Sequence, residues 1–108
     1  MIRVMKKRVG IEPEIVYIKN NLKTFQEIVG GYIEAYPIGH GLLIILDEES
    51  KIFKKKPNIS IIYKTFIDDE VKITEEIITG DIFIVREDGD EFASLTDEDI
   101  QILKKMGF

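Results

Sequence analysis

The sequence predicts one α+β domain, a twisted, mainly antiparallel sheet or a partly closed barrel with two helices. Three observations lead to this fold class. Apolar residues recur at helical spacing in only two segments, one after Asn21 and one after Thr96. Much of the remaining chain alternates or runs apolar between turn-forming residues, as strands do. The order of these elements lacks the regular strand-helix alternation of a doubly wound parallel sheet.

The first third of the chain predicts two strands and a helix. The strands lie around Val4 to Val9 and Ile15 to Ile18. Asn20–Asn21 can cap a helix, on which Leu22, Phe25 and Val29 would share one face. We expect this helix to end at Gly30 and Gly31, because glycine tolerates the left-handed conformation that closes a helix.

A β-hairpin follows. Tyr32 to Tyr36 alternates, Pro37 to Gly41 forms the turn, and Leu42 to Leu46 is the second strand. This second strand is apolar on both faces, which places it centrally in the sheet. We expect both helices over one side of it and loops or another chain over the other.

The second half predicts more strands than helices. Asp47–Ser50 is expected to be a solvated turn and Lys54–Asn58 a solvated loop, followed by a strand over Ile59–Phe66. Asp68–Glu70 interrupts it, and Val71–Ile78 predicts only a short strand or an irregular edge. Further elements are a turn at Thr79–Asp81, a strand over Ile82–Val85 and an exposed turn over Glu87–Glu91.

The last segment predicts the clearest helix. Thr96 is a typical N-cap, and Asp97–Asp99 would lie at the positive end of the helix dipole. Its apolar stripe consists of Ile100, Leu103 and Met106. We expect this stripe to pack on the sheet.

Composition narrows the class of protein. The 108 residues suit a single domain, 1–108, and the longest apolar run has five residues, whereas a membrane-spanning helix needs about 20. The absence of cysteine fits a reducing cytosol, so we expect a soluble cytoplasmic protein that is neither exported nor membrane-bound. A net charge of −5 disfavours duplex nucleic acid as a partner.

Three blocks carry a family resemblance: Leu22–Glu34, Leu42–Lys51 with Pro57–Asn58, and Gly80–Ile100. They resemble the domain-of-unknown-function family 3846, small proteins of phages and bacterial mobile elements. Asp47 and Ile59 depart from the usual pattern, in which asparagine and arginine are common at these positions. The resemblance implies a genomic setting and a domain boundary, but no mechanism.

Catalytic and metal-binding groups are sparse. His40, the single histidine, lies between two glycines in a predicted loop, where it is more easily a ligand contact than a catalyst. Asp88–Asp90 lacks the ligand ladder of a calcium loop, and Gly30–Gly31 follows a helix where a phosphate-binding loop would precede one. We therefore expect no enzyme, no metal and no cofactor.

One cluster suggests a ligand. Tyr32, Tyr36 and His40 could contact a ring, while Lys54, Lys55, Lys56 and Asn58 could contact an anionic group. The corresponding hypothesis is a non-catalytic accessory protein of a phage or mobile element that sequesters a small, nucleotide-like host signal. Core packing or a dimer interface explains Tyr32, Tyr36 and the nearby His40 more easily than a ligand does.

The alternative hypothesis is an acidic protein mimic that binds and blocks a host defence protein. It is compatible with the net charge of −5. Under either hypothesis we expect a homo-oligomer, since two short helices would leave one face of the strand Leu42–Leu46 for a partner chain to cover.

Overall fold

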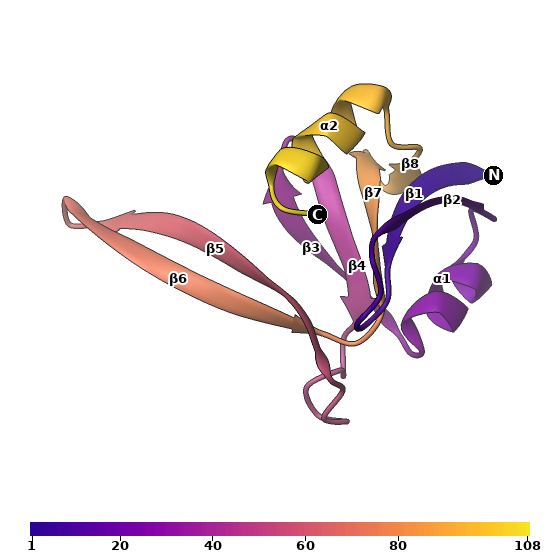
Figure 1. Ribbon diagram of the computed structural model, residues 1–108, viewed down its shortest axis with the longest axis horizontal. Helices are drawn as coiled ribbons and strands as arrows, with labels where there is room; N and C mark the ends of the chain where they lie inside the picture. The colour runs from indigo at the N-terminus through magenta and orange to yellow at the C-terminus, as the bar shows by residue number, and fades with distance from the viewer.

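The computed structural model describes residues 1–108 as a six-stranded sheet, a separate two-stranded ribbon and two helices (Figure 1). The strands of the main sheet are β1 (Ile2–Lys7), β2 (Glu14–Ile18), β3 (Ile33–Gly39), β4 (Leu42–Asp47), β7 (Ile82–Asp88) and β8 (Glu91–Ala93). All pairs are antiparallel in the order β2-β1-β7-β4-β3, with β8 beside β7. The predicted α+β class is confirmed, and the sheet is not closed into a barrel.

Helix α1 (Leu22–Val29) begins and ends where the sequence predicts. The side chain of Asn21 accepts a hydrogen bond from the Thr24 N–H at 2.8 Å, and Gly30 ends the helix with a φ of 78°. Phe25 and Val29 are buried, whereas Leu22 is exposed, so the predicted apolar face is wrong at its first residue.

Helix α2 (Asp97–Lys105) has the predicted Thr96 cap. Thr96 and Asp99 form a reciprocal capping box, in which each side chain accepts from the other residue's backbone N–H. Leu103 is fully buried and Ile100 half-buried, but Met106 is 42% exposed. The predicted stripe is therefore right at Leu103 and wrong at Met106.

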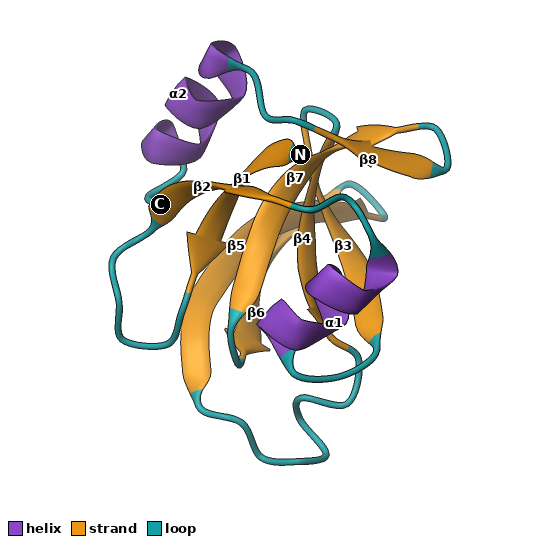
Figure 2. Cartoon of the chain, turned by 90° about the vertical axis from the view of Figure 1, so that its right-hand side faces the viewer, coloured by secondary structure: helices purple, strands orange, loops and turns teal.

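The two helices cover opposite faces of the sheet (Figure 2), so the prediction that both lie on one side is wrong. Alternation along the central strands β4 and β7 explains how both faces become core. The face under α1 is formed by Leu43, Ile45, Phe83 and Val85. The face under α2 is formed by Leu42, Ile44, Ile82 and Ile84. No face of β4 is left for a partner chain, which removes the expected reason for an oligomer.

Strands β5 (Pro57–Ile67) and β6 (Glu70–Thr79) pair only with each other and extend away from the body (Figure 1). We call this ribbon the β5–β6 arm. The predicted short strand or irregular edge over Val71–Ile78 is wrong, since β6 is ten residues long and pairs with β5 to its end. Only the base of the arm, through Ile59, Ile61 and Ile78, packs on the core of the α2 side.

The predicted turn over Glu87–Glu91 is narrower in the structure. Strand β7 continues to Asp88, and β8 begins at Glu91, so only Gly89 and Asp90 form the turn. The missed strand β8 is three residues long, too short for a pattern of alternation to be recognised.

Candidate functional site

The two predicted ligand tyrosines lie in different surroundings. Tyr32 precedes β3 and is 66% exposed. Tyr36 lies in β3 opposite Ile44, half-buried against the core of the α2 side. The structure therefore gives a packed environment to Tyr36 alone.

Tyr36 borders a small groove of about 210 Å³ between β6 and the strands β3 and β4. Four carboxylates border this groove, with a single lysine, Lys51, whose Nζ is 3.0 Å from Glu76 Oε1. The carboxylates belong to Glu34, Asp47, Glu48 and Glu76. Burial raises the pKa of Tyr36, and the nearby Tyr63 and Glu76 raise it further. Such an acidic groove favours a neutral or cationic group over an anion.

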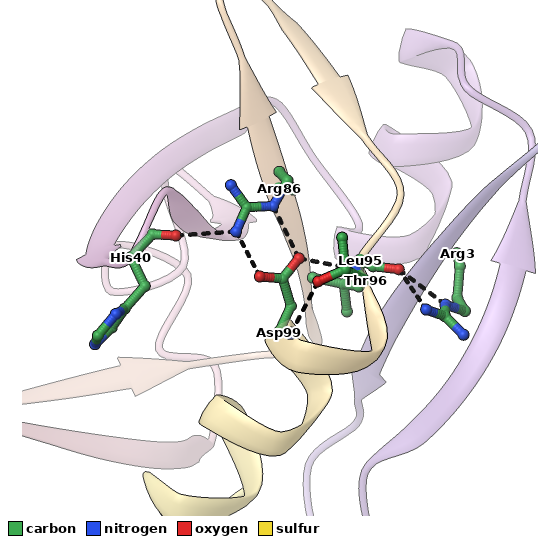
Figure 3. Close-up of polar contacts among 6 residues, drawn as sticks. All are labelled: Arg3, His40, Arg86, Leu95, Thr96 and Asp99. Atoms are coloured by element: carbon green, nitrogen blue, oxygen red, sulfur yellow. Dashed lines mark hydrogen bonds and ion pairs between the residues drawn. The ribbon is translucent and has the colours of Figure 1, made fainter.

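His40 lies in the β3–β4 turn, with a φ of 59° and an exposed side chain. Its carbonyl oxygen accepts a hydrogen bond from Arg86 Nη2 at 3.1 Å, while its ring points away from Arg86 (Figure 3). The lysine loop, Lys54–Asn58, follows the opposite end of β4. The six residues of β4 span roughly 20 Å. The structure does not bring His40 and the lysines together.

The lysine loop is less solvated than the sequence predicts. Lys54 and Lys56 are exposed, but Lys55 turns inward, with its Nζ 2.6 Å from Asp47 Oδ2 and 2.8 Å from the Val29 carbonyl oxygen. Asp47 is only 3% exposed, so the prediction of a solvated turn is wrong at this residue. Burial alone would raise the pKa of Asp47, but hydrogen bonds from Lys55 and the Glu49 backbone bring it below its usual value.

The side chain of Asn58 makes hydrogen bonds inside the protein and is not free to contact a ligand. Its Nδ2 donates to the carbonyl oxygens of Lys7 and Gly80, both at 2.8 Å, and its Oδ1 accepts from Lys7 Nζ at 2.9 Å. These bonds join β1 and the turn before β7 to the base of the arm. Because both amide hydrogens are used internally, the predicted solvated loop is wrong here also.

A second cavity, of about 360 Å³, lies where α1 ends beside the lysine loop. Lys55 and Lys56 border it, and so do the carboxylates of Glu27 and Asp81. Since Lys55 is already paired with Asp47, Lys56 is the lysine that remains to attract an anion there.

The outer face of the β5–β6 arm carries several exposed apolar side chains. Directly paired residues lie on one face of a ribbon, and Ile59, Ile61 and Ile78 define the inner face because they contact the core. The outer face consists of Ser60, Ile62, Lys64, Phe66, Val71, Ile73, Glu75 and Ile77. Its apolar members are exposed as follows: Ile62 69%, Phe66 75%, Val71 56%, Ile73 66% and Ile77 47%.

These five side chains share one face with Lys64 and Glu75, and exposed apolar patches often mark interaction sites on soluble proteins. Sequence reasoning missed this surface because it treated the two runs separately. The available signal was the two-residue interval Asp68–Asp69 between them, typical of a tight hairpin turn. In the structure both residues have the positive φ that this turn requires, 51° and 63°.

A comparison with models of known protein families identifies the family of this chain. The family model described as domain of unknown function (DUF3846) matches residues 2–107. The chain belongs to the DUF3846 family. The resemblance found in the sequence is thereby confirmed, and the matched range includes the whole β5–β6 arm. No curated protein and no solved structure matches this DUF3846 chain significantly.

The most strongly perturbed carboxylate of the DUF3846 domain is Asp99, which is 1% exposed. Arg86 holds both of its oxygens, with Nε 2.8 Å from Oδ2, and the Thr96 N–H donates to Oδ2 at 2.8 Å (Figure 3). These hydrogen bonds lower the pKa of Asp99 to about 2, against the effect of burial. Because the Asp99 carboxylate caps α2 and pairs with Arg86 of β7, we assign it a structural role.

No three side chains among the histidine and the carboxylates gather closely enough to hold a metal ion. Neither helix has the length and apolar character needed to cross a membrane.

Proposed function

We propose that this DUF3846 protein is a non-catalytic binding protein that holds a partner protein on the outer face of its β5–β6 arm. The observation that carries the proposal is the exposure of five apolar side chains on one face of a projecting ribbon. An isolated two-stranded ribbon is marginally stable in water, and exposed apolar side chains contribute little to it until something covers them. A partner surface would supply that cover.

The chemistry of the arm suggests an apolar partner surface. Its outer face carries one lysine, Lys64, and one glutamate, Glu75, among the five apolar side chains. The acidic residues gather elsewhere: at the arm tip Asp68–Glu70, at the β7–β8 turn and around the groove beside Tyr36. This distribution supports apolar docking over the acidic mimicry considered from the sequence. In the phage or mobile-element setting that the resemblance implies, the partner would be a host defence protein.

Sequestration of a small nucleotide-like ligand is the second candidate. The open depression of about 360 Å³ beside Lys55 and Lys56 favours it, because Lys56 could attract an anionic group there against the carboxylates of Glu27 and Asp81. In this arrangement Lys56 would contact the anionic group, and Tyr32, Tyr36 and His40 would lie outside the site.

Native mass spectrometry of tagged protein recovered from host cells separates the two candidates. We expect wild-type protein to retain a host protein, the double variant Ile62→Ser/Ile73→Ser to lose it, and Lys56→Glu to keep it. A retained small molecule that is lost from Lys56→Glu would favour the second candidate. A host protein retained equally by the arm variant would place the docking surface elsewhere.

A further inference from the structure

Strand β6 has an open edge. The β5–β6 arm is a two-stranded sheet, so one side of β6 has no neighbouring strand. Its two-residue turn closes on Ile67 and Glu70, and hydrogen-bonded pairs alternate from there along an antiparallel ribbon. The backbone groups that consequently face away from β5 are those of Val71, Ile73, Glu75 and Ile77. An unpaired row of this kind is a template for another strand.

We propose that this edge pairs with the same edge of a second copy of the chain, antiparallel about a two-fold axis at Thr74. The two β5–β6 arms would then form one four-stranded sheet. In this register Lys72 faces Glu76 of the second copy, and Val71 faces its Ile77. Because the axis repeats every contact, two lysine-glutamate pairs and two apolar pairs form in each dimer.

Charge selects this register among the alternatives. A two-fold axis perpendicular to the ribbon keeps each side chain on its own face, so the axis must pass through a residue. An axis through Lys72, Glu75 or Glu76 would set that residue against its own copy. An axis through Ile73 would oppose Glu70 and Glu76. Like charges directly opposite one another destabilise a sheet. Of the five possible axes through residues 72 to 76, only the one through Thr74 avoids such a pair.

This inference does not depend on the proposed function, but it would enlarge the surface on which that function rests. An axis perpendicular to the ribbon places both outer faces on the same side of the shared sheet. The two apolar patches would then form one continuous docking surface.

The absence of cysteine from the chain allows a clean cross-linking test. Thr74 would lie on the axis at a pair without backbone hydrogen bonds, where Cα atoms are about 4.5 Å apart, within the roughly 4.4–6.8 Å of disulfides. Mild oxidation should therefore convert Thr74→Cys to a covalent dimer. Lys64→Cys, which is more exposed than Thr74 but lies on β5, should remain monomeric. Equal or faster cross-linking of Lys64→Cys would overturn the proposal, because it indicates pairing through β5 or through the outer face.

Sedimentation equilibrium supplies an independent measurement without cysteine. Lys72→Glu should raise the dimer dissociation constant roughly tenfold, because two attractive pairs become repulsive. Lys72→Glu combined with Glu76→Lys should recover part of the loss, because Glu76→Lys also breaks the pair with Lys51 of the same chain. A wild-type protein that stays monomeric at several hundred micromolar, or a dissociation constant unchanged in Lys72→Glu, would contradict the proposed edge. Neither result would bear on retention of a host protein by a monomer.

Discussion

Arg86 and Asp99 form a two-pronged ion pair that ties the first turn of α2 to β7 (Figure 3). The same carboxylate accepts the Thr96 N–H, so one side chain both caps the helix and fixes it to the sheet. The guanidinium is a third exposed, and its remaining Nη2 hydrogen bond reaches the carbonyl oxygen of His40. The pair therefore joins α2, β7 and the β3–β4 turn.

Removing the charge of Asp99 should destabilise the fold. Asp99→Asn should lower the free energy of unfolding in urea by about 2–4 kcal/mol, somewhat below the usual cost of breaking a fully buried pair because water reaches Arg86. Asp97→Asn is the matched control, since Asp97 pairs with Arg3 but is 94% exposed, and it should cost less than about 1 kcal/mol. Equal losses in both variants would show that Asp99 contributes no more than a surface charge.

Acid should lower the free energy of unfolding by protonating Asp99. The pKa of Asp99 falls from an ordinary value of 3.8 to about 2 in the folded state, so the native form binds its proton less readily. The resulting stabilisation of about 2 kcal/mol is complete above pH 3.8 and is lost as the pH falls through 2. Unfolding curves of wild type and Asp99→Asn should converge across that window. A constant difference between them down to pH 2 would contradict the assignment.

Local signals were predicted from sequence more reliably than long-range ones. The caps at Asn21 and Thr96 depend on residues three positions away, and the structure confirms both. The same local view assigned Asp99 only to the helix dipole, because nothing nearby shows that Arg86, thirteen residues earlier, reaches it. Asp47 was misjudged for the same reason, its partner Lys55 being on the far side of a turn.

The sheet could be predicted only in part. The β3–β4 hairpin has a glycine-rich turn and was recognised, but the β5–β6 arm projects from the body and keeps apolar residues on its exposed face. Apolar alternation then no longer distinguishes core from surface. The placement of α1 and α2 on opposite faces likewise depends on which side of the sheet each connection takes, which no local pattern specifies.

Packing of α2 should depend on Leu103 far more than on Met106. Leu103 is fully buried, so Leu103→Ala should cost about 2–5 kcal/mol, a large share of the stability of a small domain. Met106 is 42% exposed, and Met106→Ala should cost less than half as much. Thermal unfolding followed by circular dichroism measures both. Equal shifts in the two melting temperatures would mean that the helix packs through a different face.

The phenol of Tyr36 should titrate above its ordinary pKa of 10.0, because burial, Tyr63 and Glu76 all disfavour the phenolate. Glu76→Gln should lower the pKa of Tyr36 toward the ordinary value, as should any binding of a cation in the groove. Because the pKa of Tyr36 is raised in the folded state, the protonated phenol contributes to the free energy of unfolding below pH 10. This contribution is lost as the pH rises above 10. Carbon-13 shifts of the Tyr36 ring report the titration. A pKa at the ordinary value of 10.0 for Tyr36 would contradict the packed environment.

Amide hydrogen exchange should divide the molecule into a slow body and a fast arm. Ile44 of β4 and Ile84 of β7 are fully buried and should exchange only by global unfolding. The outer half of the β5–β6 arm has no core beneath it, so amides bonded within that ribbon should exchange by local opening.

Ile73 and Glu75 make the exchange measurement specific for the proposed β6 edge. At a few micromolar their outward N–H groups should exchange almost as freely as in an unfolded chain, because β5 offers them no acceptor. At several hundred micromolar they should become protected, while the protection of Ile44 stays constant. Lys72→Glu should abolish the dependence on concentration without changing Ile44. Protection of the Ile73 and Glu75 amides already at low concentration would contradict the proposal. It would show that the β6 edge is covered within a single chain and not by a second β6 strand.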